Sequence, residues 1–103
     1  MLTITTYEVP GKGIEALGLV KGNVVQAKHI GRDLMAGLKN LAGGEIKGYT
    51  ELLTESRQIA YDRMVAEAEA MGADAIIGLR FSSSQVMEGA SEIIAYGTAV
   101  KFV

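Results

Sequence analysis

Residues 43–81 read GGEIKGYTELLTESRQIAYDRMVAEAEAMGADAIIGLRF, and this stretch decides the fold. Within it, residues 49–71 contain neither proline nor glycine and are rich in alanine, glutamate, arginine, leucine and methionine, which favour helices. Apolar side chains recur there at helical spacing, so one face of the helix is expected to pack and the other to face water. The sequence therefore predicts a helix of about six turns over residues 49–71.

Residues on either side of this helix indicate where it begins and ends. Thr50 carries a hydroxyl that can cap exposed backbone N–H groups, and Gly72 follows the last apolar position, where a left-handed residue closes a helix. Beyond Gly72, residues 75–81 are short, apolar and rich in residues that favour strands. We expect them to form a strand that is covered on much of both faces.

The rest of the chain supplies further expected elements. Alternation over residues 2–6 predicts a short strand, and the proline and glycines of residues 10–13 predict a turn. Residues 14–27 favour one bent strand, in which residues 21–23 form a bulge, and a hairpin turn at residues 21–23 is the alternative. Helical spacing predicts a first helix over residues 29–41, residues 82–85 are polar, residues 86–90 lead into a turn, and residues 91–103 alternate as a final strand.

This order of elements predicts an α+β fold in a single domain over residues 1–103. Two pairs of strands flank two helices, which favours a mainly antiparallel sheet with both helices packed on one face. The small residues Ala95, Gly97 and Ala99 alternate along the final strand. We expect the long helix to cross the sheet there, because small side chains allow a close approach.

A family resemblance rests on specific residues. It comprises Gly43, Gly44, Tyr49, Leu53, Arg57, Ala60, Met64, Ala68 and the run MGADAIIG at residues 71–78, with Arg32, Asp33, Leu34 and residues 96–100 outside the central stretch. With these residues the chain resembles the YbjQ-like family, which is labelled as heavy-metal-binding and has no assigned biochemical role. The resemblance implies a subunit akin to that of dodecin, assembling into a ring-shaped pentamer.

Composition limits the classes of partner and suggests self-assembly. The formal net charge is −2 with no run of basic residues, which disfavours nucleic acid and anionic membranes as partners. There is no cysteine, no signal-peptide pattern and no membrane-spanning apolar run, so we expect a cytoplasmic protein. Hydrophobic residues make up 49% of this small chain. Such a content favours a homo-oligomer that buries apolar surface between its copies.

Potential metal ligands are few. Without cysteine, a site for a transition or heavy-metal ion needs imidazole, carboxylate or thioether groups. His29 is the only histidine, and Asp33 follows it at helical spacing. His29 and Asp33 are thus the candidate metal ligands, with a partly exposed histidine at a helix start as the alternative. Met35, Met64 and Met71 lie on apolar helix stripes and are assigned to core packing.

The sequence favours a binding module and not an enzyme. The serines at residues 82–84 have no histidine nearby, and Tyr49 stands where a phosphate-binding loop needs lysine. Arg57 lies in a mostly apolar neighbourhood, where it either pairs across a subunit interface or binds an anion. We therefore expect a homo-oligomer that binds a metal ion. The alternatives are a small organic ligand held between subunits and a purely structural scaffold.

Overall fold

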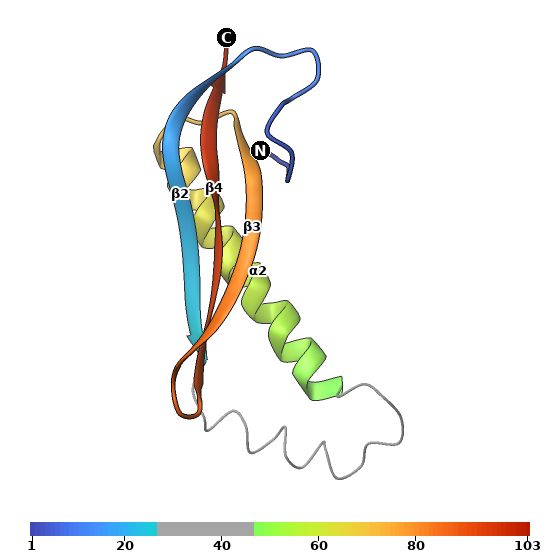
Figure 1. The fold of residues 1–103 in the computed structure, drawn as a ribbon, viewed down its shortest axis with the longest axis vertical. Helices are drawn as coiled ribbons and strands as arrows, with labels where there is room; N and C mark the ends of the chain where they lie inside the picture. The colour runs from blue at the N-terminus through green and yellow to red at the C-terminus, as the bar shows by residue number, and fades with distance from the viewer. Residues whose placement is uncertain (27–46) are drawn as a thin grey trace.

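The computed structural model describes residues 1–26 and 47–103. Its elements are β1 (Leu2–Thr3), β2 (Ile14–Gln26), α2 (Lys47–Ala70), β3 (Ala75–Met87) and β4 (Ala90–Phe102). The strands form one four-stranded sheet in the order β1-β3-β4-β2, and α2 crosses one face of it obliquely (Figure 1). The fold therefore belongs to the α+β class, as predicted, and the helix and the sheet form two layers.

The pairing of β1 corrects the predicted architecture. β1 runs parallel to β3, with Leu2 opposite Ala75 and Thr3 opposite Ile76, whereas β3–β4 and β4–β2 are antiparallel. The predicted mainly antiparallel sheet with two helices on one face is wrong, because the sheet is mixed and the described residues contain one helix. Alternation over residues 2–6 indicates a strand but carries no information on its partner or direction. The helix expected over residues 29–41 lies outside the described residues, and assembly into a ring stays a prediction.

The long helix and its end match the prediction. α2 spans Lys47–Ala70, so Thr50 lies within its first turn and not at its cap. Gly72 adopts φ 75° and donates its backbone N–H to Glu69 O at 3.0 Å, and the Ala73 N–H reaches Ala68 O at 3.1 Å. These bonds satisfy carbonyl groups at the helix end, as a left-handed glycine allows.

Two strands are confirmed with changes in detail. β2 is continuous over Ile14–Gln26, as preferred, but its register shift lies between Ala16 and Gly18 and not at residues 21–23. β3 runs on through the serines to Met87, and Glu88 and Gly89 then make a tight turn into β4. The strand predicted from the sequence ends at residue 81, before the polar residues 82–85. Pairing with β4 holds them in the sheet, although their side chains are exposed.

The main core lies between α2 and the sheet. Its buried side chains come from the helix and from the three long strands, and they include Val20, Ala60, Met64, Ala68, Ile76, Ala95 and Ala99. The closest approach is to β2, because a Cβ on Gly22 would overlap the backbone of α2 at Ala60 and Met64. The helix therefore rests above Ala95 and Ala99 as expected, but it contacts the sheet backbone at Gly22.

A smaller cluster occupies the opposite face of the sheet near the N-terminus. Ala75, Ile77 and Val100 are buried there, and the partly buried Ile4, Val9, Ile14 and Phe102 pack against them. The residues after β1 thus cover one end of the sheet. Within the described residues, no helix is long and apolar enough to cross a membrane.

Candidate ligand-binding cleft

A cleft of about 720 Å³ lies between α2, β3 and the segment that contains β1. The packing of α2 explains its position. Because α2 rests mainly on β2 and β4, the side of β3 that faces the helix layer is left partly uncovered beside it. Phe81 shares the helix-facing side with the buried Ala95 opposite it, yet 45% of Phe81 remains exposed. Phe81 therefore forms an apolar wall of the cleft, together with Ile4 and Leu79.

Neutral polar groups line the rest of the cleft. Three come from the N-terminal segment, namely Thr3, Thr5 and Thr6, and three come from α2, namely Thr54, Gln58 and Tyr61. The Tyr61 hydroxyl and Thr3 Oγ1 are hydrogen-bonded at 3.0 Å, which ties the helix to β1. One hydroxyl of this pair donates to the other, so one hydroxyl proton is left to donate to a ligand.

Arg57 supplies the only charge among the residues of 1–26 and 47–103 that line the cleft. Its helical neighbours at three and four residues are Leu53, Thr54, Ala60 and Tyr61, none of which is acidic. Neither a hydrogen bond nor an ion pair joins it to any residue of the described ranges 1–26 and 47–103. The exposed Arg57 guanidinium therefore keeps its donors available.

A second cleft of about 210 Å³ adjoins the first and shares Arg57 and Phe81 with it. Its other described lining residues are Leu53, Ser82, Ser83 and Ile93, none of which is acidic. Arg57 thus lies between two clefts on the helix side of β3, and the other described residues that line them are uncharged.

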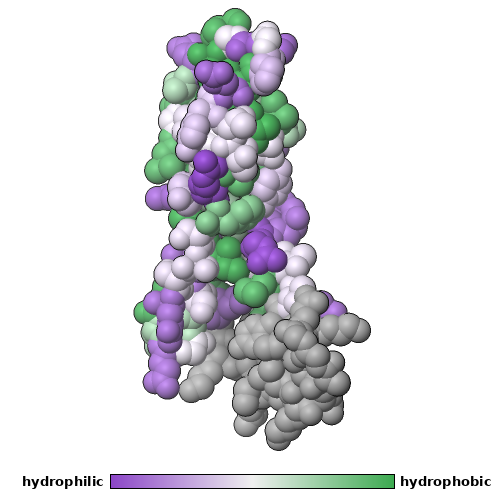
Figure 2. Space-filling model, turned by 45° about the vertical axis from the view of Figure 1, so that its right-hand side comes forward, coloured by the Kyte–Doolittle hydropathy of each residue, from purple (hydrophilic) through white to green (hydrophobic). Residues whose placement is uncertain are grey.

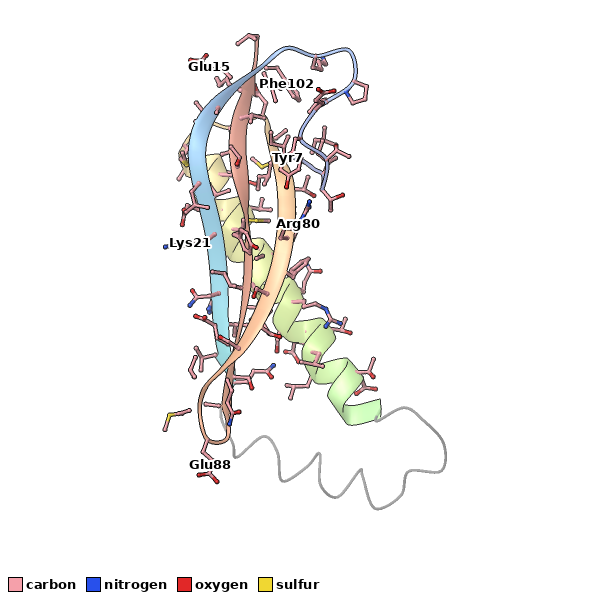
Figure 3. All side chains as sticks on the ribbon, in the orientation of Figure 1. Tyr7, Glu15, Lys21, Arg80, Glu88 and Phe102 are labelled. Carbon is pink, nitrogen blue, oxygen red and sulfur yellow. The ribbon has the colours of Figure 1, made fainter. Side chains whose placement is uncertain are left out.

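Arg80, by contrast, is hydrogen-bonded to other groups of the chain. Its Nη1 donates to Thr5 O at 2.9 Å and to Leu79 O at 2.8 Å, and its Nη2 donates to the Tyr7 hydroxyl at 3.2 Å. The guanidinium also lies 5.5 Å from the centre of the Tyr7 ring. Figure 3 shows Tyr7 and Arg80 next to each other, from the N-terminal segment and β3. Arg80 therefore fastens the N-terminal segment to β3 and keeps the cleft wall in place.

The candidate metal ligands His29 and Asp33 lie outside the described residues, so the metal site stays a prediction. Within residues 1–26 and 47–103, no three His, Cys, Asp or Glu side chains are grouped closely enough to hold a metal ion. Of the methionines assigned to the core, Met64 is buried and Met71 is exposed. The assignment is thus confirmed for Met64 and wrong for Met71.

Sequence reasoning identified Arg57 but missed the threonines of the cleft. Residues 2–6 carry three threonines in five positions, which is a visible signal of a polar strand. This signal does not predict a cleft by itself, because the parallel pairing of β1 with β3 is what brings these hydroxyls opposite the helix.

Comparisons with known proteins find similar sequences over almost the whole chain. The family model YbjQ_1, described as "Putative heavy-metal-binding", matches residues 1–103. A UPF0145 protein of Colwellia psychrerythraea is 62% identical over 102 residues, covering 98% of this chain and 97% of the relative. A UPF0145 protein of Thermotoga maritima is 64% identical over 102 residues, covering 98% of this chain and 96% of the relative.

A solved structure shares this fold. It is a crystal structure of a protein of unknown function from Pediococcus pentosaceus, assigned to the DUF74 family, with a TM-score of 0.69 and 19% sequence identity. The match covers 100% of this chain and 98% of that one. The family model and the full-length identities together show that this chain belongs to the YbjQ-like family of UPF0145 proteins.

Proposed function

We propose that this protein is a non-catalytic binding module that works as a homo-oligomer. The observation that carries the proposal is the pair of open strand edges in the sheet. β2 is the last strand on one side, and its outer edge meets no other strand of residues 1–26 and 47–103. On the other side, β1 and the residues that follow it bond to the backbone of β3 only as far as Leu79, which leaves the later part of that edge open among the described residues. Unpaired edges of this kind favour pairing with another chain.

The two open edges belong to different strands on opposite sides of the sheet. A contact between β2 of one copy and the later part of β3 of the next would therefore join unlike surfaces. Contacts between unlike surfaces form a closed ring when a whole number of rotations from one copy to the next completes a full turn. The family resemblance implies five subunits, so we propose a pentamer.

Exposed apolar side chains support the same proposal. On the face of β2 that points away from α2, Leu19 is 63% exposed and Val25 is 55% exposed. Figure 2 shows hydrophobic residues at the surface along much of the described length of the molecule, interspersed with hydrophilic ones. Burying such side chains contributes roughly 25 cal/mol per Å² of apolar surface removed from water.

Native mass spectrometry of the untreated protein tests the proposal. We expect a single species at about five times the chain mass of 10.9 kDa. A monomer at micromolar concentration would contradict it. Elemental analysis of the same sample reports any bound metal.

Heavy-metal binding at His29 and Asp33 is the second candidate, and the description of the family supports it. Titration of the oligomer with Zn²⁺ and Cu²⁺ tests it. We expect a saturable site that is lost in His29→Ala and kept in Asp62→Ala, which removes an exposed carboxylate elsewhere. The absence of any saturation below about millimolar metal would exclude this function.

A further inference from the structure

We propose that the cleft beside α2 binds a small organic anion, with its acidic group on Arg57 and its apolar body against Phe81 and Leu79. This proposal rests on the geometry of the single chain and does not depend on the oligomeric state proposed above. The ligand class follows from the charge, the walls and the size of the cleft.

The charge of the residues that line the cleft favours a negatively charged ligand. Among the described residues that line the two clefts, Arg57 is the only ionised side chain, and none of its helical neighbours at three or four residues is acidic. The other arginine at this edge, Arg80, already uses three hydrogen bonds within the chain. A guanidinium with free donors in neutral surroundings favours a carboxylate or phosphate, which it can bind through two parallel hydrogen bonds.

The walls select the rest of the ligand. Phe81 is 45% exposed, so an apolar body gains by covering it, and the largely buried Leu79 lines the same cleft beside it. The Thr3–Tyr61 pair offers one hydroxyl proton at the opposite wall. A single fixed charge, apolar walls and a few neutral donors fit a monoanion with an apolar body better than a highly charged nucleotide.

The size of the cleft is that of a small-molecule site. Its volume of about 720 Å³ falls within the range of roughly 300–1,000 Å³ that such sites occupy. The smaller cleft continues beyond Arg57 along Ser82 and Ser83. A ligand can therefore extend on either side of the guanidinium.

Binding of simple probes to the intact protein tests the proposal. Octanoate carries both a charge and an apolar body, acetate carries the charge alone, and 1-octanol carries the apolar body alone. In NMR titrations we expect octanoate to saturate one site per chain and to shift the signals of Tyr61 and Phe81. Acetate and 1-octanol are each expected to bind at least about tenfold more weakly. Equal binding of octanoate and 1-octanol would overturn the proposal.

Two matched variants locate the charge that matters. Arg57→Gln removes the charge at the cleft, and Lys21→Gln removes one from the exposed side of β2 that points away from α2. We expect Arg57→Gln to weaken octanoate binding by at least about tenfold and Lys21→Gln to leave it unchanged. Unchanged binding in Arg57→Gln would overturn the proposal.

Native mass spectrometry of both variants separates ligand binding from assembly. We expect Arg57→Gln to keep the oligomeric state of the unmodified protein. Dissociation in this variant alone would show that Arg57 pairs with an acidic group of another subunit, and it would overturn the proposal. If the unmodified protein is a monomer, the proposed assembly fails while the octanoate titration still decides the ligand site.

Discussion

Gly22 of β2 lies directly beneath Ala60 of α2, so close that a side-chain carbon on Gly22 would overlap the Ala60 carbonyl oxygen. The obstacle is backbone on both sides, which cannot move away as a flexible side chain can. The position of the helix over the sheet, and hence the opening beside β3, depends on this contact.

Gly22→Ala is therefore expected to destabilise the fold. Added volume at a packed site usually costs about 1–3 kcal/mol, and backbone on both sides places this variant towards the upper end. Chemical unfolding by guanidinium would measure the loss. Lys21→Ala, at the exposed neighbouring position, is the control and should change stability by less than about 0.5 kcal/mol. Equal stability of the two variants would mean that the helix is free to shift.

The Thr3–Tyr61 hydrogen bond predicts an energetic coupling between β1 and α2. Removing one hydroxyl in Tyr61→Phe or Thr3→Val should cost about 0.5–1.5 kcal/mol, because the bond is only partly buried. The double variant should cost less than the sum of the two, since the bond can be lost only once. Unfolding measurements on all four proteins complete this cycle. Strict additivity would show that the two hydroxyls do not interact.

Asp74 predicts a stabilising contact at the end of the helix. Its carboxylate accepts the Phe102 N–H at 2.8 Å, and its own N–H donates to Val100 O at 2.8 Å, which ties the turn after α2 to β4. Asp74→Ala removes a hydrogen bond to a charged group, so we expect a loss of about 1.5–3 kcal/mol in thermal or chemical unfolding.

Asp62→Ala provides the comparison for Asp74→Ala. Asp62 accepts only an exposed bond from Gln58, one helical turn away, which is worth about 0.2–0.5 kcal/mol. A loss in Asp74→Ala no larger than this would show that the carboxylate is replaced by water.

Leu19→Glu is expected to weaken the proposed oligomer. Leu19 is 63% exposed in the single chain, so a charge there should be tolerated in the monomer but disfavoured in an apolar contact between copies. Size-exclusion chromatography with light scattering should show a shift towards smaller species. Ala66→Glu adds the same charge at an exposed position of α2 and should leave the assembly intact. Identical behaviour of the two variants would place Leu19 outside any interface.

The periodicity of the sequence was sufficient to predict most of the individual helices and strands, but it was insufficient to predict how they are arranged in the sheet. Helical spacing and Gly72 identify α2 and its end because both depend on residues that are near one another along the chain. The direction of β1 was missed because its partner lies more than seventy residues away and the local pattern of residues 2–6 is the same for either direction. β3 was predicted too short because the serines after Phe81 stay in the strand through pairing with β4.

For the same reason, only part of the cleft could be predicted from the sequence. The absence of acidic helical neighbours around Arg57 can be seen in the sequence, and it indicates a charge without a local partner. The threonines opposite Arg57 and the exposed Phe81 depend on where α2 rests, which the contact at Gly22 determines. Spacing along the helix does not encode that contact.

The parallel pairing of β1 with β3 also bears on how the protein is made. During synthesis β1 leaves the ribosome before the other strands of the sheet, yet its partner residues Ala75 and Ile76 follow only after β2 and α2. Contacts between residues so far apart form late, because a long loop must close first. The wall that carries Thr3, Thr5 and Thr6 therefore consists of residues translated early and placed last, so a nascent chain acquires its cleft only when almost all of its sheet has been synthesised.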